Sequence, residues 1–391
     1  MRVLHSFHTY LKTTENWCYN LIANLPDTEC VIASKRFEKC NFYNPRFTYL
    51  EFPLRPAEPA TGGWLEKRYN KFVRSMLRHW YPAYVGRHAG QVDLLHSHFS
   101  FVGWEYRKLA RQLGVPHVVS FYGFDYEWLP HNEPKWVARY AAMFDEVDLF
   151  LCEGNHGMKI LQTLGCPEHK LRTARLGVET GRIPFVRRRK SPGELKLVQV
   201  ASLTPKKGHS FTVRAFLAAL SSCPGMTLTL VGGDAEGLKA ELLRIIPGEL
   251  LNTHITFIDR IDFSELHAFM ENYHVFIHPS CYSDDRDCEG GAPVVLLDAQ
   301  ATGMPVIATN HCDIPEEVID GTTGLLSDEK DVASLAASIE RFYFMGQEEF
   351  ATFADNARSH VETQYDVTHN ARLVRTIYDE LVEHHAGRST V

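Results

Sequence analysis

The sequence lacks the features that mark several classes of protein. Its nine cysteines include no CxxC pair, and an odd count without paired spacing argues against a disulfide framework. No stretch approaches the roughly eighteen consecutive apolar residues of a membrane span, and the opening MRVLHSFHTY lacks a long apolar signal core. Lys and Arg number 41 against 48 Asp and Glu, a net charge of −7, so we expect no nucleic-acid partner. The sequence therefore predicts a cytoplasmic protein with buried free thiols.

The composition is that of a globular protein. The chain has 391 residues, 45% of them apolar and 23% charged, which is long enough for two domains of roughly 100–200 residues each. Short apolar runs alternate with helical patterns, as in proteins built on parallel sheets. The runs expected to form strands are MRVLHSF, ECVIASK, FTYLEF, VDLLHSHF, PHVVSFYG and DLFLC in the first half, and LKLVQVA, MTLTLVGG, HITFID, YHVFIHPS and PVIAT in the second. We therefore predict the α/β class.

The basic segment RRRKSPG at 187–193 interrupts this alternation and is interpreted as a linker. We assign residues 1–188 to a first α/β domain and residues 189–366 to a second. Residues 367–391 are assigned to a terminal helix, and the pattern leaves open whether it packs back on the first domain. Because parallel sheets bind ligands at the carboxyl ends of their strands, we expect the active site in a cleft between the two domains.

The first candidate site is the loop of ASLTPKKGH, between a predicted strand and a helix that begins near Gly208. The Lys207 ammonium and the first N–H groups of that helix point to one place and together suit a phosphate group. A solvated lysine pair beside a glycine turn would give the same pattern, since such turns are common in α/β sheets. The loop alone leaves both interpretations open.

The second candidate site is EGGAPVVLLDA, where two glycines precede a helix that begins near Pro293. Glycines let a ligand approach the backbone, and proline is tolerated at the first helical position. Glu289 and Asp298 can accept hydrogen bonds from hydroxyl groups. The segment therefore suits a ligand with a phosphate at one end and sugar hydroxyls at the other. A buried apolar helix would explain PVVLL but not EGGAP.

Taken in order with HSHFSFVG, VVSFYGFD, LGCPEHKLRTARLGVE, LVGGD and DGTTGLL, these segments resemble the retaining family-four glycosyltransferases, and the bacterial exopolysaccharide and colanic-acid type in particular. The resemblance implies the glycosyltransferase B (GT-B) fold, two Rossmann-like doubly wound domains facing across a cleft, with the acceptor on the first and a nucleotide sugar on the second. It implies transfer of a hexose, with retention and without a metal or other cofactor. The donor would be a UDP-sugar rather than a GDP-sugar, and the acceptor a glycan, a lipid-linked or a small molecule.

In this family an Arg and a Lys after the first strand of the second domain hold the donor diphosphate. Lys207 matches the Lys, but the Arg position falls on Ser202. Either Lys206, Arg260 or a first-domain residue compensates, or the diphosphate is bound more weakly. The family also has two acidic residues eight positions apart, one near the donor sugar and one on the ribose. Here Glu289 and Asp298 are nine apart, which we interpret as a one-residue insertion. The resemblance thus implies a donor-binding set of Ser202, Lys206, Lys207, Gly233, Arg260, Glu289, Gly290, Gly291, Ala292, Pro293, Val294 and Asp298.

In the first half, Tyr122 of SFYGFD replaces a family His that contacts the donor sugar. A phenol can donate a hydrogen bond, but its pKa near 10 makes it a poor base at neutral pH. Thr14 is a candidate helix cap that can meet a phosphate. His98 is expected to face the cleft, although a structural histidine fits the pattern equally well. The expected acceptor-binding residues are Thr14, His98, Tyr122, Asp125 and Glu153, and the expected catalytic residues are Glu289, Lys207, His98 and Tyr122.

Two further patterns bear on ligands. One set of residues could in principle surround zinc, but its spacing fits no standard finger, so we expect no metal site. That set is His278, Cys281, Cys288, His311 and Cys312. Residues 64–88 mix basic and aromatic side chains, which suits peripheral attachment to an anionic membrane at its inner face. A helix with core aromatics and solvated basic residues would look the same, and both interpretations stay open.

Two other functions are compatible with the sequence. A nucleotide-sugar epimerase of the same fold would account for the cleft but not for EGGAP and TPKKGH together. A catalytically silent sugar-nucleotide-binding scaffold subunit is suggested by Ser202 and Tyr122, which depart from the family pattern. Release of nucleoside diphosphate, measured with and without acceptor, distinguishes the three.

Overall fold

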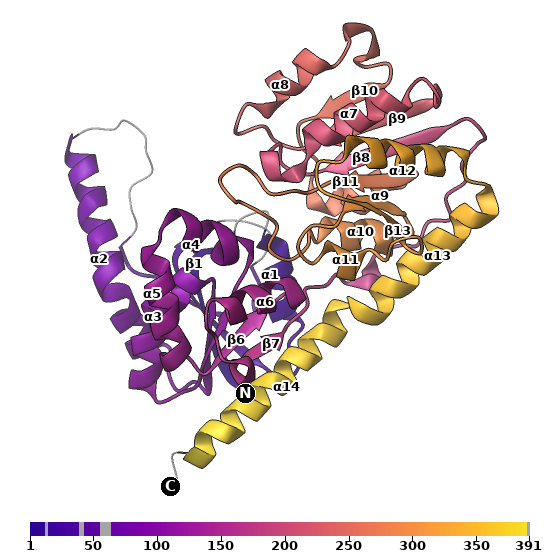
Figure 1. Ribbon diagram of the computed structural model, residues 1–391. Coiled ribbons are helices and arrows are strands. Elements are labelled where there is room, and N and C mark those ends of the chain that lie inside the picture. The colour runs from indigo at the N-terminus through magenta and orange to yellow at the C-terminus, as the bar shows by residue number, and fades with distance from the viewer. Residues whose placement is uncertain (12–14, 39–42, 55–63, 389–391) are drawn as a thin grey trace.

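The computed structural model describes residues 1–11, 15–38, 43–54 and 64–388, and Thr14 of the expected acceptor site lies outside them. The chain forms two parallel β-sheets of seven and six strands, each enclosed by helices, in two domains that lie side by side (Figure 1). This arrangement confirms the prediction of two doubly wound α/β domains. The eight described cysteines are free thiols, and seven of them are buried.

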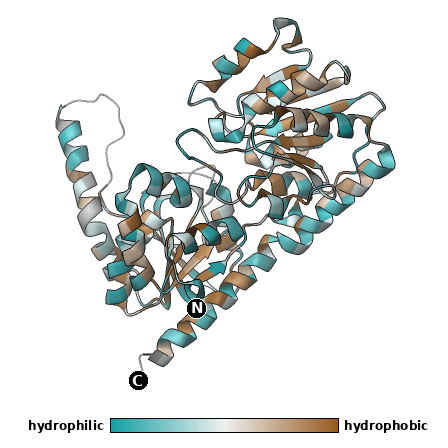
Figure 2. Ribbon diagram, viewed as in Figure 1, coloured by the Kyte–Doolittle hydropathy of each residue, from teal (hydrophilic) through white to brown (hydrophobic). Residues whose placement is uncertain are grey.

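The first sheet has the strand order β3-β2-β1-β4-β5-β6-β7, and its strands are parallel. Its strands are β1 (Arg2–Tyr10), β2 (Glu29–Phe37), β3 (Thr48–Leu50), β4 (Leu94–His98), β5 (His117–Ser120), β6 (Leu149–Cys152) and β7 (Leu171–Thr173). Every residue of β4, β5 and β6 is buried, because helices cover both faces of the sheet. The brown strands inside teal-edged helices show this layering in Figure 2.

The helices of the first domain divide between the two faces. One face carries α1 (Asn16–Ala23), and the other carries α2 (Trp64–His88) and α3 (Ser100–Leu113). The segment after β5 makes a short π-helical turn (Phe124–Trp128) before the remaining helices. These are α4 (Leu129–Asn132), α5 (Lys135–Glu146) and α6 (Asn155–Thr163). None of the described helices in either domain is both long and apolar enough to cross a membrane.

The second sheet has the strand order β10-β9-β8-β11-β12-β13 and is also parallel. Its strands are β8 (Leu195–Val200), β9 (Met226–Val231), β10 (Ile255–Ile258), β11 (Val275–His278), β12 (Val306–Thr309) and β13 (Gly324–Ser327). One face packs on α7 (His209–Ala219), α8 (Leu238–Ile245) and α12 (Val332–Phe344). The other packs on α9 (Leu266–Met270), α10 (Val295–Ala301) and α11 (Ile314–Glu317).

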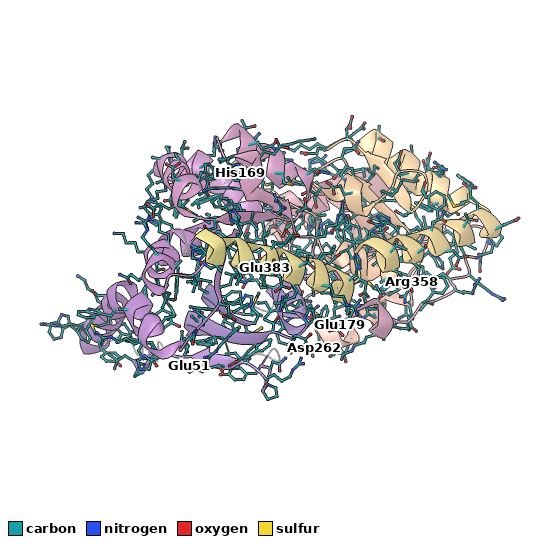
Figure 3. The ribbon with its side chains drawn as sticks, turned by 90° about the horizontal axis from the view of Figure 1, so that it is seen from below. Glu51, His169, Glu179, Asp262, Arg358 and Glu383 are labelled. Carbon is teal, nitrogen blue, oxygen red and sulfur yellow. The ribbon has the colours of Figure 1, made fainter. Side chains whose placement is uncertain are left out.

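Two long helices connect the domains. Figure 3 shows α13 (Gln347–Gln364), which carries Arg358, and α14 (Val367–Arg388), which carries Glu383, running beneath both domains. Helix α13 packs on α10, and α14 returns to the first domain, where Val374 and Tyr378 enter the same apolar cluster as α1. Between the two helices, Asp366 forms a parallel bridge with Val178. The chain therefore crosses between the domains twice, at adjacent positions.

The boundary between the domains lies in the irregular segment from β7 to β8. Within it, Arg188 is buried and donates hydrogen bonds to the carbonyls of Met270, Tyr273 and Thr302, all in the second domain. Lys190 donates to the carbonyl of Tyr343 on α12. Part of the predicted basic linker is thus anchored on the second domain, because its side chains satisfy carbonyls at the ends of helices there.

Candidate active site

The loops at the carboxyl ends of β8 and β11 meet at the middle of the second sheet. The strand order β9-β8-β11 means that the chain leaves these two neighbouring strands toward opposite edges of the sheet. Such a reversal opens a crevice at the carboxyl ends, where α/β proteins bind ligands. Lys207 follows β8 and Glu289 follows β11, so the fold brings both predicted residues to this crevice.

Lys207 and Glu289 form an ion pair there. The Lys207 Nζ lies 2.7 Å from Glu289 Oε2, and the two side chains are 17% and 7% exposed. Helix α7 begins two residues beyond Lys207, so the positive end of its dipole adds to the ammonium charge. Lys206 Nζ lies 3.1 Å from Asp287 Oδ1 and donates to the carbonyl that precedes Glu289. Two ammonium groups therefore line this loop, a charge distribution that suits an anionic ligand.

The Glu289 carboxylate is held on both oxygens. Ser280 Oγ donates to Glu289 Oε1 at 2.8 Å, and His278 Nε2 lies 3.7 Å from the same oxygen. Burial raises the pKa of Glu289, but Lys207 and then His278 lower it, and the resulting pKa lies well below the ordinary value. Glu289 is therefore an ionised acceptor that can bind hydroxyl groups, and it holds no proton to donate.

The glycine loop after Glu289 touches the first domain. Gly290 has φ +79°, and a Cβ there would lie 1.8 Å from the Cα of Gly123, in the loop after β5. A Cβ at Gly291 would lie 1.8 Å from Oε2 of Glu153, which follows β6. Burial, and then the neighbouring carboxylates of Asp313 and Glu289, raise the pKa of Glu153 well above its ordinary value. Residues from the carboxyl edges of both sheets thus meet at this loop.

The other predicted donor residues lie around the same edge. Asp298 is buried in α10, and its Oδ1 accepts a hydrogen bond from His267 Nε2 at 2.8 Å. Ala292, Pro293 and Val294 lead from the glycine loop into α10, while Ser202, Gly233 and Arg260 are exposed beyond the ends of β8, β9 and β10. The structure therefore brings the donor set to one side of the second sheet, and it gives Asp298 an internal partner.

His98 and Tyr122 lie in the core of the first domain. Of the two interpretations of His98, the structure favours a structural histidine over one that faces the cleft, because the ring is fully buried where α1 covers this side of β4. His98 Nε2 lies 3.2 Å from His5 Nδ1, and its Nδ1 lies 2.9 Å from the Tyr122 hydroxyl and 3.2 Å from Cys18 Sγ. Burial lowers the pKa of His98 and raises that of Tyr122, so both groups are neutral.

Asp125 has a structural environment as well. Its Oδ1 accepts hydrogen bonds from the backbone N–H and hydroxyl of Ser100, and its Oδ2 accepts one from the Tyr122 N–H. These bonds fix the start of α3 against the loop after β5. Burial raises the pKa of Asp125 to about 7. The expected acceptor contact is therefore replaced by internal hydrogen bonds, since the carboxylate is fully buried.

Three residues of the site were missed as such in the sequence. They are Ser280, which holds the Glu289 carboxylate, and His311 and Glu329, which follow β12 and β13. His311 had been considered only as a zinc ligand. Their position in the sequence could have indicated them, because each residue stands at or just beyond the carboxyl end of an apolar strand, where parallel sheets bind ligands.

Among the residues described by the structure, one group of three ligating side chains has its atoms within 4.8 Å of one another. It consists of His5, His96 and His98, all buried. His96 already pairs with the Tyr378 hydroxyl at Nδ1 and with Ser120 Oγ at Nε2, so the group is a hydrogen-bonded network within the core. The five cysteines and histidines considered in the sequence do not form such a group.

Comparison with known proteins identifies the family of both halves. Residues 14–182 match the model of glycosyltransferase family 4, and residues 185–360 match that of glycosyl transferases group 1. Over 282 residues the chain is 31% identical to a Salmonella typhimurium protein named as the colanic acid biosynthesis glycosyltransferase WcaL, covering 70% of this chain and 67% of that protein. AmsK of Erwinia amylovora, an amylovoran biosynthesis glycosyltransferase, is 28% identical over 278 residues, with 70% and 67% covered.

Solved structures agree in fold. HepE of Anabaena, in complex with UDP, superposes with a TM-score of 0.73 at 17% identity, over 97% of this chain and 100% of that one. The same protein has also been solved with UDP-glucose. With two parallel-sheet domains, a Lys207–Glu289 pair at the carboxyl edge of the second sheet and these relatives, the chain belongs to the family 4 and group 1 glycosyltransferases of GT-B fold.

Proposed function

We propose that this glycosyltransferase takes a hexose from a nucleoside-diphosphate sugar bound at the carboxyl edge of the second sheet. The observation that carries the proposal is the largely buried Lys207–Glu289 pair, 2.7 Å apart beside a glycine loop. An ammonium at a helix start suits a diphosphate, and an ionised carboxylate suits sugar hydroxyls. A UDP-sugar is proposed rather than a GDP-sugar, and the UDP and UDP-glucose complexes of HepE support that choice.

The proposed reaction retains the anomeric configuration and needs no metal. Lys207 and Lys206 would stabilise the negative charge that develops on the leaving diphosphate, and fixed donors of this kind contribute roughly 3–4 kcal/mol each. The diphosphate itself would take the proton of the acceptor hydroxyl. Glu289, kept ionised by Lys207, would orient the sugar through its hydroxyls. Family resemblance supports this reaction mechanism, and the ionised state of Glu289 is compatible with it.

The acceptor is proposed to be a glycan, a lipid-linked or a small molecule bound on the first domain. Relatives that act in colanic acid and amylovoran biosynthesis support a growing polysaccharide. Glu153 is the first-domain candidate that lies at the glycine loop, since its carboxyl group adjoins Gly291. Its raised pKa leaves it able to donate a hydrogen bond to an acceptor oxygen.

Release of nucleoside diphosphate tests the proposal directly. Purified protein would be mixed with UDP-, GDP-, ADP- and TDP-hexoses, with and without acceptor, and thermal shifts would be measured with the free diphosphates. Release that depends on acceptor, with the anomer of the product analysed by NMR, is the expected result. Conversion of the donor sugar without release would support an epimerase, and binding without either reaction would support a silent scaffold. No thermal shift with any diphosphate would contradict the donor site.

We also propose that α2 attaches the protein to an anionic membrane on its cytoplasmic side. At 100° per residue, the buried Val73, Leu77 and Tyr81 face one side of the helix, and the exposed Trp64, Arg68 and Phe72 face the other. Figure 1 shows the start of α2 projecting beyond the first domain. Apolar rings interleaved with basic groups bind anionic lipid surfaces.

Liposome sedimentation tests the membrane proposal. We expect the protein to sediment with phosphatidylserine-containing vesicles at low salt and to remain in the supernatant with purely zwitterionic ones. Phe72→Ser combined with Trp64→Ser should reduce that binding severalfold, because both side chains are more than half exposed. The matched control is Phe344→Ser, an equally exposed aromatic in the second domain. Equal recovery of wild type and double variant with anionic vesicles would contradict the proposal.

A further inference from the structure

His311 connects the backbone of Glu289 to a second carboxylate. The Glu289 N–H donates to His311 Nε2 at 3.2 Å, and His311 Nδ1 lies 2.7 Å from Glu329 Oε1. Glu329 Oε2 accepts a further hydrogen bond from the Tyr282 N–H at 3.0 Å. The four residues come from the loops after β11, β12 and β13. Three neighbouring loops at the donor edge are thereby joined through one imidazole ring.

The partners of His311 determine which of its nitrogens carries the proton. Burial raises the pKa of Glu329, but its hydrogen bond with His311 lowers it, and the resulting pKa lies below the ordinary value. An ionised carboxylate accepts and does not donate, so His311 Nδ1 must carry the hydrogen. His311 Nε2 is then the acceptor that the Glu289 N–H requires, and the Cys312 thiol, 3.2 Å away, shares it. The Tyr282 ring stands edge-on at 4.9 Å and limits rotation of the imidazole.

The loop beyond Glu289 is held through its backbone and by close packing, because its residues carry no polar side chain. Gly290, Gly291 and Ala292 carry no side chain that can hold a position, and Gly290 has a positive φ of 79°. The Asp313 N–H donates to the Gly291 carbonyl at 3.1 Å, and the hydrogen bond to His311 holds the other end of this stretch, at Glu289. A displacement of about 1 Å in a positioning element can cost on the order of a hundredfold in rate.

We propose that His311, oriented by Glu329, is a positioning residue that fixes the backbone at Glu289 and the glycine loop for the nucleotide-sugar donor. This inference rests on the proposed function, since it assigns a role within the same donor site. In this role His311 acts through Glu289, whose N–H it binds. The Glu329 carboxylate, which fixes the tautomer of His311, also accepts the Tyr282 N–H, and the Tyr282 hydroxyl donates to Glu127 of the first domain at 3.0 Å. His311 and Glu329 therefore lie between the donor loop and a contact between the domains.

The test compares His311→Ala, His311→Gln and Glu329→Gln. We expect His311→Ala to lower kcat/KM for the donor by about ten- to a hundredfold and to weaken UDP binding, with the acceptor KM unchanged. His311→Gln places an amide oxygen near the position of Nε2 and should recover most of the loss. In Glu329→Gln the new amide can donate to His311 Nδ1. The imidazole proton then moves to Nε2, where it opposes the Glu289 N–H. We expect the loss of donor kcat/KM to lie between those of His311→Gln and His311→Ala.

A matched control removes another histidine hydrogen bond from the same domain. His254→Ala loses the contact of Nδ1 with the Met226 carbonyl at 2.9 Å, far from the crevice, and should lower the unfolding midpoint without changing donor KM. The proposal is overturned if folded His311→Ala keeps wild-type UDP affinity and donor kcat/KM, or if His311→Gln is no better than His311→Ala. A wild-type protein that binds no nucleoside diphosphate would instead contradict the proposed function.

Discussion

Lys207 and Glu289 were predicted as members of two separate candidate loops, and the fold brings them together as an ion pair. They follow β8 and β11, which are neighbours in the sheet although β9 and β10 lie between them in the sequence, so the sequence predicted the edge of the sheet but not the proximity of the two residues. The sequence did not predict that they contact each other directly. That contact changes the expected behaviour of the site, because a largely buried carboxylate depends on its partner for its charge.

Replacing Lys207 with Ala should therefore have two effects. Turnover should fall on the order of a hundredfold, because the charge that stabilises the leaving diphosphate is lost. The free energy of unfolding should fall by about 3 kcal/mol, because Glu289 is left buried without its ammonium. Donor turnover and urea unfolding measure the two effects. Lys207→Arg keeps a positive charge and should therefore retain more turnover and more stability than Lys207→Ala.

The matched control for Lys207 is Lys196→Ala. Lys196 also pairs with a glutamate, Glu194 at 3.1 Å, but this pair is exposed, and such pairs contribute at most about 1 kcal/mol. Near-normal turnover of folded Lys207→Ala would show that the phosphate site is elsewhere.

At the scale of single residues the sequence could not predict the burial of the histidines. His96 and His98 lie two residues apart in β4, so their side chains share one face of the strand, yet the sequence does not show what covers that face. The cover comes from Cys18 on α1 and from Tyr378 on α14, the latter 282 residues away from His96. Local patterns specify which side chains share a face, whereas long-range packing decides whether that face meets a cleft or a core.

Most strands could be predicted from the sequence. Eleven of the apolar runs correspond to β1 to β6 and β8 to β12, since strands buried on both faces are almost continuously apolar. The edge strands β7 and β13 were missed. Strand β7 has only three residues, Leu171–Thr173, of which one is buried, and β13, Gly324–Ser327, begins with a glycine inside a turn-rich segment. Short or turn-flanked strands give too little periodicity to be recognised.

Helix α14 makes a polar contact in the core of the first domain that can be tested. The Tyr378 hydroxyl lies 2.6 Å from His96 Nδ1, and both groups are buried. Tyr378→Phe should reduce the free energy of unfolding by about 1–3 kcal/mol, because the imidazole nitrogen loses its partner where water cannot replace it. Urea unfolding measures this loss, and Arg372→Ala on the exposed side of α14 serves as control. An unchanged midpoint for Tyr378→Phe would mean that α14 is not seated as described.

Carboxyl groups from both domains lie together at the contact between the domains. Glu153 of the first domain faces Asp313 and Glu317 of the second around a small cavity of about 10 Å³. Asp313 Oδ1 accepts the N–H of His156 at the start of α6, whereas Asp313 Oδ2 and Glu317 Oε2 are buried without a hydrogen-bond partner. Burial and acidic neighbours raise the pKa of all three carboxyl groups. The contact between the domains therefore favours protonated carboxyl groups.

This contact predicts a dependence of stability on pH. Burial, followed by Glu316, raises the pKa of Asp313 from 3.8 to about 7. The folded state binds this proton more tightly than the unfolded chain, so the stabilisation is complete below about pH 4 and is lost as pH rises through about 7. Asp313→Asn keeps an acceptor for His156 and cannot ionise, so its unfolding midpoint should fall less than that of wild type between about pH 5 and pH 8.

Thermal unfolding across that range measures the effect on the interdomain contact. Asp125 also has a pKa of about 7, so it too makes the protein less stable as the pH rises. The unfolding midpoint of Asp313→Asn should therefore still fall with pH, but less steeply than that of wild type. Asp234→Asn, at an exposed position in the second domain, is the control. Parallel curves for wild type and Asp313→Asn would contradict the assignment.

The return of α14 to the first sheet also has a consequence for biosynthesis. Residues 1–188 leave the ribosome early, but the face of their sheet that carries α1 lacks the rest of its cover until residues 371–378 have been made. The core of the first domain is therefore complete only after the second domain has been synthesised. During this interval the face of the sheet that carries His96 and His98 is incompletely shielded from water, and the nascent chain depends on its second half to finish its first.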